Sequence, residues 1–203
     1  MKNLETLLKD YIKHAADRAS KGIPPLALNA AETNTVTELL ESADPSDSEY
    51  LINLLKERVP PGVDEAAYVK ASWLTAIANG EKTSKCIDPK EAIKILGTMI
   101  GGYNVNALVE IIKKEDFILS QIAADMLKKI ILVYDSANDI FELSIKNIYA
   151  KQVVDSWANA EWFISKKSLP EEIICVAFKV DGETNTDDLS PAVHATTRPD
   201  IPL

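Results

Sequence analysis

Apolar side chains recur every three or four residues along most of the chain, which is the spacing of one face of an α-helix. The first such segment runs from Leu4 to Ala15, and Gly22 closes it ahead of two prolines. Two further segments carry Val36–Leu40 and Tyr50–Leu55, and Pro60-Pro61-Gly62 interrupts the chain after them. This pattern predicts three helices before residue 60.

The next two helices are marked by their ends as well as by their apolar faces. A helix is predicted from Asp64 to Asn79, with Gly80 supplying the left-handed residue that often follows a helix. Its apolar stripe is made of Ala67, Ala71, Leu74 and Ala78. Asp88-Pro89-Lys90-Glu91 is a helix start in which aspartate caps, proline takes the first position and glutamate reaches back to the cap amide. Gly97 ends that helix.

Three more helices are predicted after a glycine-rich turn at Gly101-Gly102. This turn is either a tight bend between helices or a place where the backbone approaches a ligand closely. The segment Phe117–Tyr134 is apolar on nearly all sides, which is typical of a central helix. Asp135-Ser136 starts a weaker helix, and Tyr149–Ile164 forms the last one.

Residues 1–164 thus form a mostly α domain of roughly eight helices with short connections. Short connections give antiparallel neighbours, arranged either as a compact bundle or as stacked helical pairs. A period near 40 residues, as in HEAT-like pairs, is suggested, although no clean sequence repeat is visible.

The character of the chain changes near residue 165. A polar linker containing Pro170 leads into residues 172–181, whose β-branched and apolar residues predict a strand. A polar loop follows at 182–192, and a turn-rich element contains Arg198. The 39 residues 165–203 are too few to build a core of their own. We therefore expect a short β-containing fragment that was cut from a larger enzyme.

The composition argues against a nucleic-acid-binding domain and against a membrane-spanning protein. The 203 residues are 46% hydrophobic and 26% charged, with a formal net charge of −9. A duplex-binding domain normally carries a basic stripe, and none is visible here. No apolar run approaches the ~20 residues that span a bilayer. A cytoplasmic protein that binds no membrane is expected.

The cysteines and histidines do not suggest a metal site within this chain. Cys86 and Cys175 lie far apart, and His14 and His194 are the only histidines. Cys86 is interpreted as a loop or partly buried thiol, since no activating base is near it in sequence. Cys175 alternates with apolar neighbours and is interpreted as strand packing.

Several blocks of sequence resemble the aconitase B family, the bacterial aconitate hydratase 2. They occur in the family's order and span nearly the whole chain. The blocks are Arg58–Ala71, Leu96–Asn104, Tyr149–Val153, Ser156–Phe163, Phe178–Val180, Gly182–Ala192 and Arg198–Leu203.

This resemblance implies a HEAT-like helical domain at residues 1–164, followed at 165–203 by the start of a swivelling domain. It also implies an enzyme, a lyase, that interconverts citrate and isocitrate through cis-aconitate in the tricarboxylic acid cycle. Its [4Fe-4S] cluster is held by three cysteines of later domains, so this chain alone is expected to bind no metal and to be inactive. Implied partners are a second copy through the helical domain, other metabolic enzymes, and messenger RNA in the cluster-free form.

Three site residues are carried over from the family. Arg198 resembles the substrate-binding arginine, whose guanidinium fork suits a tricarboxylate. Asp187 and Ser190 resemble an Asp and a Ser that support the active site in related aconitases. Asp188 stands where those relatives have histidine, which puts proton transfer there in doubt. Turn capping is the structural alternative for Asp187, Asp188 and Ser190.

Two other functions stay open at this point. One is a stand-alone helical module for protein interactions without catalytic activity. The other is an iron-responsive region that regulates through RNA, against which the charge of −9 argues.

Overall fold

The computed structural model describes residues 2–44, 48–62, 64–100, 102–130, 132–166, 168–177, 179, 181–183 and 185–186, with backbone only for residues 2–8. This part of the chain is mostly α, as predicted. None of its helices is both long and apolar enough to cross a bilayer. The ten helices among these residues are α1 (Lys2–Ser20), α2 (Ala30–Ser42), α3 (Glu49–Glu57), α4 (Glu65–Ala78), α5 (Pro89–Leu96), α6 (Tyr103–Lys113), α7 (Phe117–Leu127), α8 (Ser136–Ser144), α9 (Ile148–Ala158) and α10 (Glu161–Ile164).

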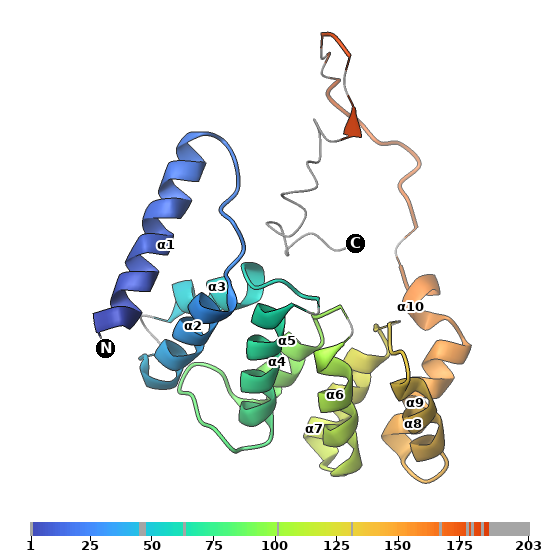
Figure 1. Cartoon of the computed structure of the whole chain (residues 1–203). Coiled ribbons are helices and arrows are strands. Elements are labelled where there is room, and N and C mark those ends of the chain that lie inside the picture. Colours follow the sequence, from blue (N-terminus) through green and yellow to red (C-terminus); the bar gives the residue numbers. More distant parts are fainter. Residues whose placement is uncertain are drawn as a thin grey trace.

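The helices from α2 to α9 lie side by side, and we call this arrangement the helical row (Figure 1). Helix α4 packs against α2, α5 and α6, and α7 packs against α5, α6 and α9. Helix α1 lies beyond one end of the row, whereas α8 and α9 form the other end (Figure 1). One continuous core of buried hydrophobic side chains runs between these helices.

Three side chains of helix α1 form hydrogen bonds with the loop that follows it. The Tyr11 hydroxyl donates to the Leu26 carbonyl at 2.7 Å, and the Leu26 amide donates to His14 Nε2 at 3.2 Å. Arg18 Nε donates to the Pro24 carbonyl at 2.5 Å. Spacings of three, four and seven residues place these side chains on one face of the helix. Burial raises the pKa of Tyr11 to about 12, which keeps its hydroxyl protonated and able to donate.

The predicted helix starts are confirmed. Asp64 and Asp88 are the N-caps of α4 and α5, and their carboxylates accept from the amides three residues on, at 2.9 and 2.7 Å. Gly80 has the expected left-handed φ of 75°. The expected reach of Glu91 back to the cap amide was wrong. Its carboxylate instead accepts from Lys56 Nζ at 2.6 Å, because α3 brings this ammonium beside it.

Gly97 does more than end helix α5. A side-chain carbon at this position would overlap the Cβ, Cγ and Sδ atoms of Met126 on α7. The missing side chain therefore permits the close approach of α5 to α7, which pack against each other.

The predicted helix Phe117–Tyr134 was too long and too buried. Helix α7 ends at Leu127, and Tyr134 adopts a left-handed φ of 47°, which an α-helix cannot contain. Ser120, Ala123 and Ala124 are buried, whereas Phe117 is 81% exposed. Helix α7 does contact three other helices, yet its first turn projects from them.

The predicted helix Tyr149–Ile164 is divided into α9 and α10. Ala160 has a φ of 51°, so the helical hydrogen bonding stops there and restarts at Glu161. Asn147 caps the start of α9.

The described residues between 168 and 186 contain no β-strand. Cys175 is exposed, as are its neighbours Ile174 and Val176. The prediction that Cys175 packs within a strand was therefore wrong for the described chain. No helix or sheet of the described chain covers this segment. The strand predicted at 172–181 includes positions 178 and 180, which lie outside the described residues, and it stays a prediction.

Candidate functional site

The three site residues predicted from sequence, Asp187, Ser190 and Arg198, lie outside the described residues. Their roles therefore stay predictions. The Gly101-Gly102 turn is described at Gly102, whose φ of 75° precedes helix α6. The geometry there supports a tight bend between helices.

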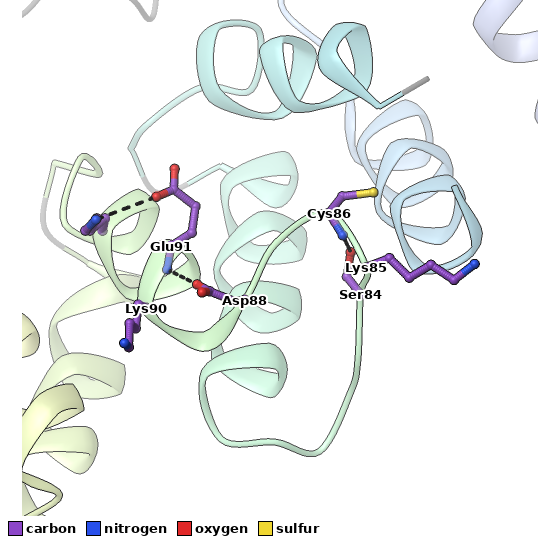
Figure 2. A pocket seen from close by; sticks show the side chains of 7 residues that line it. Ser84, Lys85, Cys86, Asp88, Lys90 and Glu91 are labelled. Carbon is purple, nitrogen blue, oxygen red and sulfur yellow. Dashed lines mark hydrogen bonds and ion pairs between the residues drawn. The ribbon is translucent and has the colours of Figure 1, made fainter. Parts of the chain in front are cut away.

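A depression of about 380 Å³ lies between the loop that follows α4 and the first turns of α5 (Figure 2). Its wall combines lysines, carboxylates, a hydroxyl and a thiol. The lining residues are Ser84, Lys85, Cys86, Asp88, Lys90, Glu91 and Lys94.

Most polar groups of this depression already hold the loop in place. The Ser84 hydroxyl donates to the Leu40 carbonyl at 2.6 Å and accepts from the Cys86 amide at 3.1 Å. Lys85 Nζ lies 3.0 Å from Asp44 Oδ1. The Asp88 carboxylate serves as the cap of α5 (Figure 2). These bonds anchor the loop on α2 and α5, and they leave no nucleophile paired with a base.

Cys86 behaves as the sequence predicts, as a partly buried loop thiol. It is a free cysteine, and its Sγ lies 3.5 Å from the Ala43 carbonyl. No group of three His, Cys, Asp or Glu residues suited to a metal occurs in the described part of the chain.

The side chain of Lys70 on α4 is an unusual buried group that was not predicted from the sequence. It is only 1% exposed, and its Nζ donates to the Lys56 carbonyl near the C-terminal end of α3 at 3.4 Å. Burial lowers the pKa of Lys70 to about 8, while nearby Glu57 opposes this shift. The negative end of the α3 dipole favours an ammonium at this place.

Helical spacing could have revealed this lysine. Position 70 follows Ala67 by three residues and precedes Leu74 by four, so it falls within the buried stripe of α4. The lysine packs between helices α3 and α4 and faces no depression that the described structure shows. We interpret it as a structural residue of the row.

Two family models match this chain. The model described as Aconitate B N-terminal domain matches residues 10–163. The model described as Aconitate hydratase 2 N-terminus matches residues 175–203. Together they cover the helical row and the segment that contains the three predicted site residues.

Known relatives match over almost the full chain. It is 56% identical over 197 residues to Aconitate hydratase B of Synechocystis sp., 50% over 198 to that of Escherichia coli and 46% over 200 to that of Helicobacter pylori. These matches cover 97–98% of this chain and 23% of each relative. The chain thus spans about a quarter of the length of these relatives, and it belongs to the aconitate hydratase B family, whose N-terminal domain it contains.

Proposed function

We propose that this chain acts as the N-terminal portion of an aconitate hydratase, a lyase that interconverts citrate and isocitrate through cis-aconitate in the tricarboxylic acid cycle. The observation that carries this proposal is the match to aconitate hydratase B relatives over 97% of the chain, at up to 56% identity. Identity at this level over nearly 200 residues supports a shared role for the corresponding portion of those proteins.

Within this portion, residues 1–164 serve as a HEAT-like platform of stacked antiparallel helical pairs. The row of neighbouring helices and its continuous core support this assignment. Residues 165–203 form the start of the swivelling domain, including the strand predicted at 172–181. Exposed apolar side chains at Ile173, Ile174 and Val176 support it, because a strand of a larger sheet would bury such residues.

The donor set of this chain does not fit the [4Fe-4S] cluster of an aconitase. Holding such a cluster requires several thiolates at one place. The sequence contains two cysteines, of which Cys86 is directed at a backbone carbonyl and Cys175 lies on the exposed C-terminal segment. The cluster is therefore assigned to other domains of the enzyme.

The isolated 203-residue chain is accordingly expected to show no broad visible absorption after anaerobic reconstitution with iron and sulfide. It is also expected to turn over no citrate. The full-length enzyme, treated in parallel, is the control that shows reconstitution succeeds. A stoichiometric cluster, or citrate turnover by the chain alone, would contradict the proposal that both require the other domains of the enzyme.

Arg198 is proposed to bind a substrate carboxylate, with Asp187 and Ser190 supporting the same active site. A guanidinium holds a carboxylate by two parallel bonds, whereas an ammonium offers a point charge. In the full-length enzyme, Arg198→Lys is expected to lower kcat/KM roughly tenfold or more, as the loss of one charge-assisted hydrogen bond would. Steady-state kinetics with citrate and isocitrate measure this, and wild-type values would remove Arg198 from the site.

The platform is further proposed to make protein contacts in the cytoplasm, as a homodimer and with other metabolic enzymes. Exposed apolar side chains at the α8 end of the row support a contact role, which would also suit a stand-alone interaction module. Messenger RNA stays a minor candidate for the cluster-free form. A gel-shift titration that finds no affinity at low salt would remove it.

A further inference from the structure

Helix α10 is joined to the row through a bend that no buried side chain of its own holds. Ala160 has a left-handed φ of 51°, so the chain changes direction between α9 and α10. This conformation is unfavourable for a residue with a side chain, and the surrounding structure must hold it. None of the residues of α10 is buried, and Phe163 and Ile164 are 61% and 67% exposed. Burial within the described chain therefore does not fix the direction of α10.

A side-chain hydrogen bond crosses the bend instead. The Ser156 hydroxyl on α9 donates to Glu161 Oε2 on α10 at 2.7 Å. Ser156 is only 2% exposed, so its hydroxyl has little access to water. A bond from a hydroxyl to a carboxylate is charge-assisted and stronger than a bond between neutral groups. The Ser156–Glu161 bond thus ties α10 to the buried face of α9.

The end of α9 that carries Ser156 is itself fixed on the row. Trp157 Nε1 donates to the Leu127 carbonyl at the end of α7, at 3.1 Å. Val153, one turn earlier on α9, is fully buried in the core. Helices α7 and α9 also pack against each other. Ser156 is therefore a firm point of attachment, and the direction of α10 depends on its bond to this residue.

Helix α10 determines where the next part of the enzyme begins. The segment after α10 leads away from the row (Figure 1), and its described residues 168–177 are exposed and form no helix or strand. Only residues 165–171 separate α10 from the strand predicted at 172–181. Because this connection is short, a change in the direction of α10 displaces the domain that follows. Arg198, which is proposed to bind a substrate carboxylate, belongs to that domain.

We propose that Glu161 is a positioning residue of the enzyme, which holds α10 in one direction through Ser156 and thereby places Arg198 against the substrate. This proposal rests on the proposed function of Arg198. A guanidinium that holds a carboxylate by two parallel bonds needs an aligned approach. When the Ser156–Glu161 bond is lost, α10 can turn about Ala160, and the aligned arrangement is populated for only part of the time. The apparent affinity for substrate falls by that fraction, while the chemical step of the bound substrate is unchanged.

Pulsed electron paramagnetic resonance of the 203-residue chain measures the direction of α10. One spin label is attached at Lys113→Cys on α6 and the other at Lys166→Cys, directly after α10; both lysines are exposed. The native thiols are removed by Cys86→Ser and Cys175→Ser. With the Ser156–Glu161 bond intact, a single narrow distribution of label distances is expected.

Glu161→Ala and Ser156→Ala are each expected to broaden this distribution, because each removes one partner of the bond. Glu161→Gln keeps an acceptor oxygen and is expected to restore the narrow distribution. Glu142→Ala is the matched control, since it removes an exposed carboxylate of α8 and should leave the distances unchanged.

Steady-state kinetics of the full-length enzyme test the link to the substrate. Glu161→Ala is expected to raise KM for citrate roughly threefold or more, with kcat nearly unchanged. Glu161→Gln and Glu142→Ala should both retain the wild-type KM. In the double variant of Glu161→Ala and Arg198→Lys, KM should rise by less than the product of the two separate effects, because both act at one carboxylate contact.

The proposal is overturned if Glu161→Ala leaves the distance distribution narrow, or if it leaves KM for citrate at the wild-type value. Independent effects that multiply in the double variant would also overturn it, since Glu161 would then not act through Arg198. The proposed function of Arg198 fails separately, if Arg198→Lys alone has wild-type kinetics. The label distances need no substrate, so the two failures are distinguishable.

Discussion

Asn147→Ala is expected to lower the free energy of unfolding by about 2–3 kcal/mol. The side chain is 3% exposed, and its Oδ1 accepts from the Tyr149 and Ala150 amides at 2.9 and 3.0 Å. Its Nδ2 donates across the row to the Ile112 carbonyl. Alanine removes the cap of α9, worth about 1 kcal/mol, and leaves the Ile112 carbonyl without this buried donor.

Urea unfolding followed by circular dichroism measures this loss. Asn138→Ala on α8 is the matched control, since Asn138 is exposed, and its change should stay within about 0.5 kcal/mol. Asn147→Ser keeps a capping oxygen and loses the donor to the Ile112 carbonyl, so it should recover part of the stability. If Asn147→Ala and Asn138→Ala unfold at the same urea concentration, the bond from Asn147 to the Ile112 carbonyl of α6 does not stabilise the fold.

Helix caps and buried helix faces are the features of this chain that the sequence predicts best. The caps Asp64 and Asp88 were predictable because each places a carboxylate three residues before an amide of the first helical turn. Gly80 was predictable because it follows the last apolar position of a stripe. The buried faces of α4 and α5 follow directly from the spacing of their aliphatic residues.

The wrong predictions concern features that depend on the backbone geometry and on contacts between helices. Apolar periodicity runs through Ala160 without interruption, and only the backbone φ reveals the break between α9 and α10. Phe117 is apolar and yet exposed, because the first turn of α7 projects beyond the row. The Lys56–Glu91 pair joins residues 35 positions apart, which no local pattern could indicate.

The candidate site could be predicted from sequence only through family resemblance. Asp187 and Ser190 are ordinary residues of a polar loop, and turn capping would use the same residue types. Arg198 belongs to a turn-rich element after that loop, where nothing local distinguishes it from other arginines. The roles proposed for them depend on a substrate, and on a cluster that other parts of an aconitase would hold. A chain that spans 23% of the length of its relatives does not contain those other parts.

Raising the pH from 7 to 9.5 is expected to add about 2 kcal/mol to the free energy of unfolding through Lys70 alone. Burial lowers the pKa of Lys70 to about 8 in the folded chain, whereas an unfolded lysine titrates near its ordinary value of 10.5. Between these two values the unfolded chain binds more protons than the folded chain. The contribution of Lys70 to the free energy of unfolding therefore rises with pH. Below pH 8 the buried side chain is charged, and its desolvation lowers the stability most.

Comparison with Lys70→Met isolates this contribution, because methionine fills a similar volume without titrating. Urea unfolding at pH 7 and pH 9.5 should show the gain in the wild-type chain and in Lys129→Met, whose lysine is exposed, but not in Lys70→Met. The range stops below pH 10 because Tyr11 acts in the opposite sense. Its pKa of about 12 in the folded chain means that ionisation of the unfolded chain reduces stability above pH 10. Equal pH dependence in all three proteins would show that Lys70 reaches water when charged, and that the α3–α4 contact opens to admit it.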